Sequence, residues 1–248
     1  MLFSKLRAPE AHALIDRGAV ALWPIGSTEA HGPHLPLDTD STIASEASLG
    51  ACHSIKARAG LEAVVLPTLA FGVADYAKSF RGTISIPRST QEAYVSDVLI
   101  ALAQQGFRAI VVVNGHVEPA HRFTLRDAAK RARSSTPCPI GIADPADRRF
   151  AQSLGEEFAS GSCHAGRYES SIVMAADPTA VAEPLRQTLP RLDIDILAGA
   201  RAGRITFAEL GADQAYCGDP AAASRQEGEL RLRALAEMVT QVACELVG

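Results

Sequence analysis

The chain has 248 residues, with 24 Lys and Arg against 28 Asp and Glu, so its formal net charge at pH 7 is −4. This balance excludes the basic surplus typical of nucleic-acid-binding proteins and the long one-sided charge run of an acidic disordered tail. Hydrophobic residues make up 47% of the chain, which is enough for one sizeable core, and we expect a single domain over residues 1–248.

The N-terminal stretch MLFSKLRAPEAH carries charges at Lys5, Arg7 and Glu10 and lacks the apolar run of a signal peptide. No apolar stretch approaches the roughly 18 residues that cross a bilayer. The five cysteines are scattered and form no CxxC pair, which disfavours both a disulfide framework and a zinc ribbon. We therefore expect a soluble cytoplasmic protein with free thiols and with no membrane or nucleic-acid partner.

Short β-rich runs alternate with helical patterns along the chain, which is typical of an α/β protein. The run 109–113 is wholly apolar, as expected for a parallel strand covered on both faces. Ser89 to Glu92 fits a capping box that opens a helix, and Gly106 fits its end. The predicted strands span 20–25, 64–66, 109–113 and 139–143, and the predicted helices span 40–59, 89–105, 119–134, 148–158, 168–176 and 222–246. Residues 178–220 show no regular period beyond a turn at 201–204. The predicted fold class is α/β, with a central, mostly parallel sheet flanked by helices.

Two loops that follow predicted strands are rich in polar residues. The loop at 26–40 follows the first strand, and the loop at 114–118 follows the strand 109–113. In open parallel sheets the ligand site lies at the carboxyl ends of the strands, where such loops meet. Together the two loops offer three histidines and four carboxylates, the ligand types that zinc, manganese and iron accept. The sequence therefore predicts a metal site at this edge of the sheet.

The spacing of these residues favours two ions rather than one. Glu29 and His31 form an i,i+2 pair, as do His116 and Glu118, and each pair could divide its side chains between adjacent ions. Asp40, at the start of a helix, would bridge the two ions. Each residue also has an ordinary structural explanation, such as helix capping for Asp40 or a solvated loop position for Glu29. Their joint occurrence on two strand-end loops favours the metal site.

The chain resembles the creatininase (creatinine amidohydrolase) family in four segments that occur in order. The first is WPIGSTEAHGPHLPLDTD, from Trp23 to Asp40, which is similar to the N-terminal metal motif of that family. Phe71-Gly72 with FRGTIS from Phe80 resembles its substrate-loop segment, and NGHVE from Asn114 resembles its second metal motif. The segment HAGRYESS from His164 is similar to its HAGxxETS-like motif, and Gly218-Asp-Pro220 also fits.

The resemblance implies a layered α/β fold, a centre of two divalent ions (Zn, Mn or Fe) and a homohexamer that acts on a small-molecule amide. By motif position, the metal ligands would be Glu29, His31, Asp40, His116 and Glu118. Glu118 would also take part in catalysis, as would His164 beside the scissile group. His34 and Glu169 would lie behind the ligands and orient them. The substrate would contact Ala74, Val117 and His164.

Several positions depart from creatininase itself. Trp23, in the first predicted strand, is the chain's single Trp, although creatininase surrounds its substrate with Trp residues. Ala74 stands where creatininase has a substrate-contacting Ser, and Val117 where it has a Tyr. Ser160 and Gly161 replace a Trp and an Asp of the lid. Creatinine is therefore not the expected substrate, and another small cyclic or linear amide is favoured.

The predicted reaction is hydrolysis of a C–N bond by a hydroxide held between the two ions, with one ion stabilising the oxyanion. His164 would donate a proton to the leaving nitrogen, although capping of the following helix is its alternative role. Asp75, Tyr76, Lys78 and Arg81 could bind an anionic substrate or form an ordinary loop. Two further family activities remain open: deformylation of a formylamino-pyrimidine nucleotide, and cleavage of a cofactor-precursor peptide. A metal-stabilised binding protein without turnover is the alternative from another class.

Overall fold

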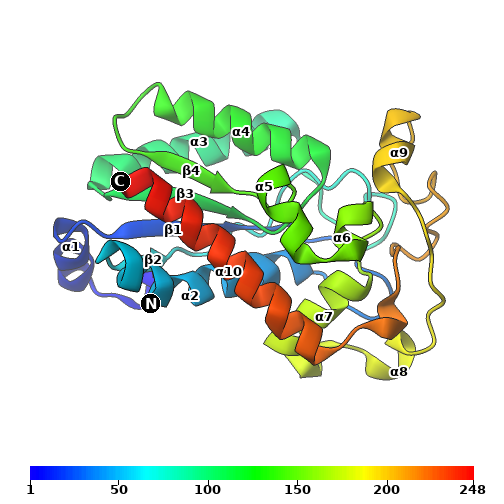
Figure 1. The fold of residues 1–248 in the computed structure, drawn as a ribbon. Helices are drawn as coiled ribbons and strands as arrows, with labels where there is room; N and C mark the ends of the chain where they lie inside the picture. Colours follow the sequence, from blue (N-terminus) through cyan, green and yellow to red (C-terminus); the bar gives the residue numbers. More distant parts are fainter.

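The computed structural model describes the backbone of residues 1–248 and every side chain except that of Leu197. Its centre is a parallel sheet of four strands, namely β1 (Val20–Ile25), β2 (Ala63–Val65), β3 (Ala109–Asn114) and β4 (Ile140–Ala143), in the order β2-β1-β3-β4 (Figure 1). The predicted α/β class with a parallel sheet flanked by helices is confirmed. Within the described chain, no helix is both long and apolar enough to cross a membrane.

The central strands β1 and β3 are buried at every position, which explains their continuous apolar sequences. They pair in register from Val20 opposite Ala109 to Ile25 opposite Asn114. Both strands therefore end at the same edge of the sheet. The loops at 26–40 and 114–118 leave from that edge side by side.

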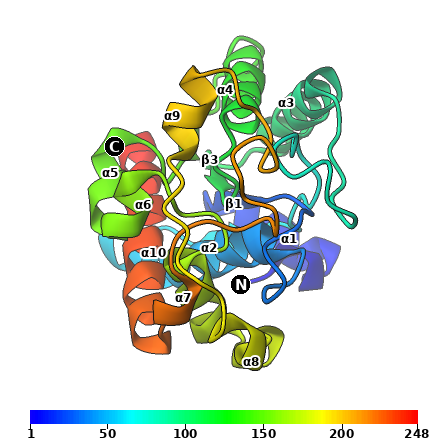
Figure 2. The same ribbon diagram turned by 90° about the vertical axis from the view of Figure 1, so that its right-hand side faces the viewer.

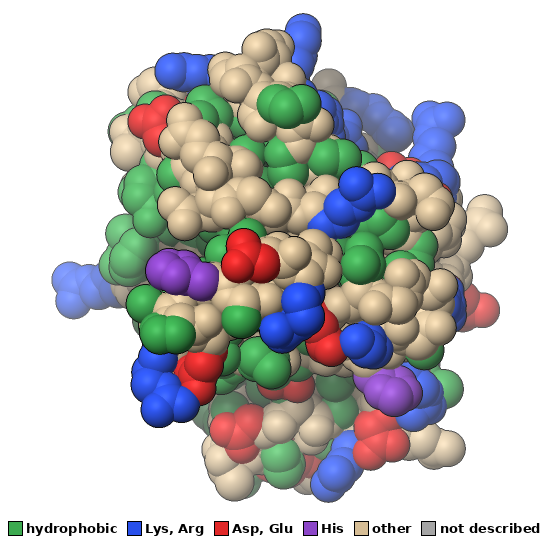
Figure 3. Space-filling model, turned by 90° about the vertical axis from the view of Figure 1, so that its left-hand side faces the viewer, with side chains coloured by type: hydrophobic (Ala, Val, Ile, Leu, Met, Phe, Trp, Pro, Cys, Tyr) green, Lys and Arg blue, Asp and Glu red, His purple; other side chains and the backbone are tan. Residues whose placement is uncertain are grey.

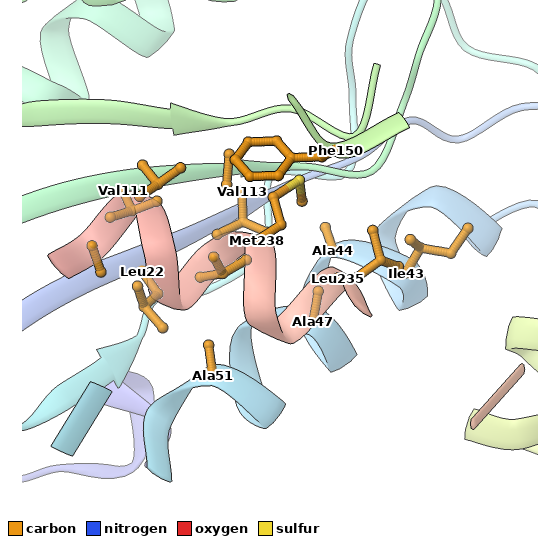
Figure 4. Close-up of a cluster of buried hydrophobic side chains, with 14 of the residues drawn as sticks. Leu22, Ile43, Ala44, Ala47, Ala51, Val111, Val113, Phe150, Leu235 and Met238 are labelled. Carbon is orange, nitrogen blue, oxygen red and sulfur yellow. The ribbon is translucent and has the colours of Figure 1, made fainter. Parts of the chain in front are cut away.

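Alternate strand residues face two different hydrophobic layers, as the two-residue period of a strand requires. Leu22 and Val111 pack in one layer with helices α2 (Thr39–Ala59) and α10 (Arg225–Val247), and Figure 4 shows part of it. Trp23 and Val112 pack in the other layer with helices α1 (Ala8–Asp16), α3 (Arg88–Gln105) and α4 (Pro119–Arg133). The sheet is thus covered on both faces.

The predicted helix 148–158 is wrong as a continuous element. The chain instead forms α5 (Arg148–Ala151), the 3-10 turn η2 (Gln152–Leu154) and α6 (Glu156–Ser160). Gly155 breaks the helix because its φ of 98° and ψ of 169° lie in a region that is almost exclusive to glycine.

Two predicted helix starts also need correction. The capping box at Ser89 is not formed, because α3 begins one residue earlier, after Pro87, without a side-chain cap. The last helix starts at Arg225 rather than at 222, because the Ser224 side chain accepts a hydrogen bond from the Glu227 N–H and caps it there. Residues Pro220–Ala222 form a separate 3-10 turn, η4.

The region 178–220, for which the sequence shows no period, contains only short elements. These are η3 (Pro178–Ala180), α8 (Glu183–Arg186) and α9 (Ile196–Arg201), which follow α7 (Arg167–Ala176). The predicted turn at 201–204 is confirmed, with the Arg204 N–H bonded to the Gly199 carbonyl at 3.0 Å. Figure 2 shows this segment, coloured yellow to orange, crossing in front of the end of the sheet.

Figure 3 shows the opposite end of the molecule, where acidic and basic side chains are interspersed.

Candidate metal centre

The five predicted metal ligands lie together at the carboxyl ends of β1 and β3. Glu29 and His31 come from the loop after β1, Asp40 from the first turn of α2, and His116 and Glu118 from the loop after β3. All five side chains are buried. The parallel register of β1 and β3 is what brings the two loops together.

Two glycines at the strand ends let the first turn of α2 approach very closely. A Cβ on Gly26 would lie 2.5 Å from the Ser41 nitrogen, and a Cβ on Gly115 would lie 2.1 Å from the Asp40 carbonyl oxygen. Neither position has room for a side chain. The absence of side chains there allows the Asp40 carboxyl group to sit between the two loops.

Asp40 faces a different histidine with each of its carboxylate oxygens. Its Oδ1 lies 3.3 Å from His31 Nε2, and its Oδ2 lies 3.0 Å from His116 Nδ1. Glu29 Oε1 is 3.2 Å from the same His116 nitrogen. Three sets of side chains are close enough to hold an ion: His31, Asp40 and Glu169; Glu29, His116 and Glu118; and Glu29, His31 and His164. The position of Asp40 is that of a carboxylate able to bridge two ions.

Backbone carbonyls fix which nitrogen of each histidine faces the cluster. His31 Nδ1 hydrogen-bonds to the Glu29 carbonyl at 3.1 Å, and His116 Nε2 hydrogen-bonds to the Val73 carbonyl at 2.9 Å. Since a carbonyl only accepts, these ring nitrogens carry the protons. In the neutral rings, the lone pairs of His31 Nε2 and His116 Nδ1 are thereby left for a ligand.

A buried chain of hydrogen bonds supports the carbonyl that holds His116. The Val73 N–H donates to Gln91 Oε1 at 2.8 Å, and Gln91 Nε2 donates to His121 Nδ1 at 3.1 Å. The His121 ring also packs edge-on against His116, with centroids 4.7 Å apart. The contacts of Gln91 and His121 thus position Val73 and, through it, the imidazole of His116.

The chemistry of the cluster fits divalent ions. Four buried atoms in it lack a hydrogen bond to any described residue outside the cluster: Glu29 Oε2, His31 Nε2, Asp40 Oδ2 and Glu118 Oε1. Buried polar atoms are rarely left unpaired, and these four are nitrogen and carboxylate oxygen atoms of the kind that metals accept. A metal centre requires several such ligand atoms close together in one place.

Burial and close charged neighbours shift the pKa values of the side chains in the cluster. Burial raises the pKa of Glu118 to about 7 and that of Glu169 to about 8. Burial disfavours the charged form of His31, yet the carboxylates of Asp40, Glu169 and Glu29 raise its pKa to about 10. In the metal-free chain, protons therefore balance the crowded carboxylates. Binding of cations would release them.

His164 lies at the edge of the same cluster. Its Nε2 donates to the Ala30 carbonyl at 2.9 Å, and its Nδ1 is 3.9 Å from Glu29 Oε1. The ring stacks on Phe207 with centroids 4.2 Å apart. Burial lowers the pKa of His164 to about 4, so the ring is neutral. The alternative role as a helix cap is not observed, because Gly166 is the N-cap of α7 and no side chain caps this helix.

The segment after His164 joins it to Glu169. The Ala165 N–H donates to Glu169 Oε2 at 2.6 Å, and the same oxygen lies 3.6 Å from His31 Nε2. Ala165 has a φ of 49°, in the left-handed region that favours glycine. Glu169, which is predicted to lie behind the ligands, contributes an oxygen to the group with His31 and Asp40 that is close enough to hold an ion.

A cavity of about 160 Å³ opens above the cluster. Its closed end includes Glu29, Asp40, His116, Glu118, His164 and Glu169, and the predicted substrate contact Val117 lines it as well. Ala74, the other predicted substrate contact, is fully buried, donates its N–H to Ser85 Oγ at 3.0 Å and is not among the described lining residues. His34 hydrogen-bonds to Ser170 Oγ at 2.8 Å, one residue beyond Glu169.

Most residues of the cavity wall could not be identified from local sequence patterns. Tyr76, in the predicted substrate loop, lines the cavity and donates its N–H to Glu118 Oε2 at 3.1 Å. Phe158, Ile196 and Phe207 complete an apolar wall, and Arg122 adds a cation. Ile196 and Phe207 come from the region without periodicity, where no local pattern identifies them. Arg122 is separated from Glu118 by one helical turn, which is the one signal available in the sequence.

Comparison with known proteins identifies the family. Residues 4–243 match the family model described as creatininase (creatinine amidohydrolase). The chain belongs to the creatininase family. It is 32% identical to a mycofactocin precursor peptide peptidase of Mycolicibacterium smegmatis over 94% of this chain and 85% of that protein. It is also 33% identical to the creatinine amidohydrolase of Pseudomonas putida, over 40% of this chain and 38% of that enzyme.

Solved creatininase structures share the fold. A manganese creatininase superposes with a TM-score of 0.74 at 22% identity, covering 98% of this chain and 97% of that one. Another creatininase superposes with a TM-score of 0.74 at 23% identity, covering 100% and 98% of the two chains. The expected creatininase-like fold is confirmed. Family membership makes the chain a creatininase-family, metal-dependent hydrolase, and its buried clusters of His, Glu and Asp are consistent with a centre of two metal ions.

Proposed function

We propose that this chain hydrolyses the amide bond of a small linear substrate, in the manner of a peptidase, with the help of two divalent ions. The observation that carries the proposal is the buried cluster of three histidines and four carboxylates at the closed end of an apolar cavity. When bound, the ions would supply Lewis acidity and lower the pKa of water. The choice among zinc, manganese and iron is open, because this ligand set suits all three.

Asp40 would be shared between the two ions. His31 would hold one ion, with Glu169 within reach, and His116 would hold the other with Glu29 and Glu118. The opposed positions of His31 and His116 on either side of Asp40 support this division. The carbonyls of Glu29 and Val73 keep the two rings in the required orientation.

Two side chains would move protons. Glu118 Oε2 is fixed by the Tyr76 N–H, while Oε1 has no described partner, so Oε1 is placed to accept a proton from the attacking water. His164 holds its proton on Nε2 against the Ala30 carbonyl and turns Nδ1 toward Glu29. Since the ring is neutral, Nδ1 would take up the proton that Glu118 accepts from the water and deliver it to the leaving nitrogen.

Two observations favour a linear amide over creatinine. The peptidase relative aligns with almost the whole chain, whereas the creatinine amidohydrolase aligns with less than half of it. Trp23 is buried in the sheet, in the layer formed with α1, α3 and α4, so it cannot wall a substrate pocket. Creatinine therefore remains a test compound rather than the proposed substrate.

Metal analysis and one substitution test the proposal. Purified protein reconstituted with Zn²⁺, Mn²⁺ or Fe²⁺ should bind about two ions per chain, and short peptides, formamides, lactams and creatinine should be screened for amide cleavage. Glu118→Gln should lower kcat by about 10²–10⁴-fold while circular dichroism stays unchanged. Metal binding without cleavage of any compound would instead favour a binding protein. By family membership we also propose a homohexamer, which light scattering would measure.

A further inference from the structure

The cavity above the cluster has one fixed cationic side chain at its wall. Arg122 lies in the first turns of α4, and Asp144 lies directly after β4, so both project from the carboxyl end of the sheet. Arg122 Nε donates to both carboxylate oxygens of Asp144, at 3.1 and 2.8 Å. The arginine is thereby held by its inner nitrogen. Its two terminal nitrogens make no hydrogen bond to any described residue.

The charge around Asp144 is not balanced. Arg126 Nη2 donates to the same carboxylate at 3.2 Å, so two guanidinium groups share one acid and leave a net charge of +1. The two arginines differ in position. The Arg122 side chain is 15% exposed and lines the cavity, whereas that of Arg126 is 46% exposed and is not among the described lining residues.

The rest of the described wall is apolar or aromatic. Tyr76, Phe158 and Phe207 supply rings, and Ile196 adds an aliphatic side chain. The cavity of about 160 Å³ lies below the roughly 300–1,000 Å³ typical of sites that enclose a drug-sized ligand. A peptide could therefore insert only its terminal part. The apolar wall, the Arg122 cation and the buried cluster together determine which chemical groups the terminal part of the peptide should carry.

We propose that Arg122 binds the free carboxylate of the substrate, and that the enzyme cleaves the amide bond that precedes a C-terminal apolar or aromatic residue. This inference rests on the proposed function. The terminal Arg122 nitrogens form paired hydrogen bonds with the carboxylate, the geometry in which guanidinium groups bind best. The aromatic wall covers the side chain, and the bond to be cleaved faces the cluster.

The reaction is balanced by one water molecule. Its oxygen forms a bond to the acyl carbon, and the bond from that carbon to nitrogen breaks. One proton of the water is transferred to the leaving nitrogen. The products are a shortened carboxylic acid and a free amino acid. The carboxylate held by Arg122 is not changed in the reaction, so Arg122 acts in binding and specificity.

A pair of substrates and a pair of variants test this proposal. N-acetylglycyl-L-phenylalanine should be cleaved with a kcat/KM about tenfold or more above that of its C-terminal carboxamide, since a hydrogen-bonded charge is lost in the amide. Arg122→Gln should remove this preference, mainly by raising KM for the acid. Arg126→Gln is the matched control because it removes a charge from the same Asp144 outside the cavity but leaves the Arg122 hydrogen bonds in place, so it should retain most of the preference. Equal cleavage of acid and amide by the wild type, or an unchanged preference in Arg122→Gln, would overturn the inference but not the proposed hydrolysis.

A binding measurement separates the two proposals if neither peptide is cleaved. Calorimetry with metal-loaded protein should show that L-phenylalanine binds more tightly than L-phenylalaninamide, and that Arg122→Gln but not Arg126→Gln abolishes the difference. That result would support the carboxylate site although the proposed hydrolysis had failed. Equal or absent binding of both compounds would reject the site.

Discussion

The two parts of the cavity are built in different ways. Most side chains of its closed end come from the loops that follow β1 and β3 and from the first turn of α2, and the register of the sheet brings these together, while His164 and Glu169 are added by α7 and the residues before it. Its wall consists of apolar rings and one arginine from segments as distant as 76, 158 and 207. We infer from this difference that the side chains of the closed end determine the reaction and those of the wall determine the substrate.

The largest effect is expected at the closed end, from Asp40→Ala. Removing a carboxylate that faces both histidines should eliminate the shared ligand, lower the metal content below two ions per chain and reduce kcat/KM by about 10³-fold or more. Atomic absorption and steady-state kinetics would measure this. Asp38→Ala, at the exposed position before α2, is the control. Retention of two ions in Asp40→Ala would contradict a shared carboxylate.

His164→Gln should have the next largest effect and should act on the rate alone. We expect kcat to fall by about 10²-fold through loss of proton transfer, while both ions stay bound. Metal content measured on the same sample distinguishes this from ligand loss. If the variant instead bound only one ion per chain, His164 would be a metal ligand. Its grouping with Glu29 and His31 also allows that role.

Gln91→Leu should weaken metal binding although Gln91 is not among the described residues that line the cavity. The substitution breaks the chain of hydrogen bonds that holds the Val73 carbonyl against His116, and we expect about a tenfold loss in affinity. Competition with a chelator would measure the affinity, and the visible spectrum of the cobalt form would report the geometry at His116. Gln104→Leu, at an exposed site on the same helix, is the control. Equal affinities of the two variants would remove Gln91 from the positioning of His116.

The smallest effect is expected at the wall, from Phe207→Leu. This change retains an apolar side chain and should cost less than about 1.5 kcal/mol of stability. The loss of the ring that stacks on His164 should raise KM for a C-terminal phenylalanine several-fold, with metal content unchanged. Substrates that end in alanine provide the comparison. A change in metal content would show that wall and closed end are not separable.

The sheet and the convergence of the candidate ligands at one edge of it could be predicted because their signals are local. The apolar run that became β3 and the polar residues placed directly after it both follow from simple rules of parallel sheets. The break at Gly155 was missed, since the helical pattern around it continues and only the observed φ reveals the interruption.

The cavity wall could not be predicted in the same way. Phe207 and Ile196 belong to a segment of short turns, so neither periodicity nor caps identify their partners. The proximity of Glu169 to His31 also depends on tertiary structure, because Glu169 lies in α7 and His31 lies in the distant loop at 26–40. Residues whose roles arise from contacts between distant segments leave no local pattern.

Helix α10 has a consequence for how the protein is made in the cell. It follows every other element in chain order, yet it covers the alanine-rich side of α2 and one face of the sheet (Figure 4). It also packs on α7 so closely that a Cβ on Gly228 would lie 1.8 Å from the Ser171 carbonyl oxygen. Synthesis proceeds from the N-terminus, so this apolar surface stays open until residues 225–247 have left the ribosome. Complete burial of this face of the sheet is therefore expected only after translation of α10.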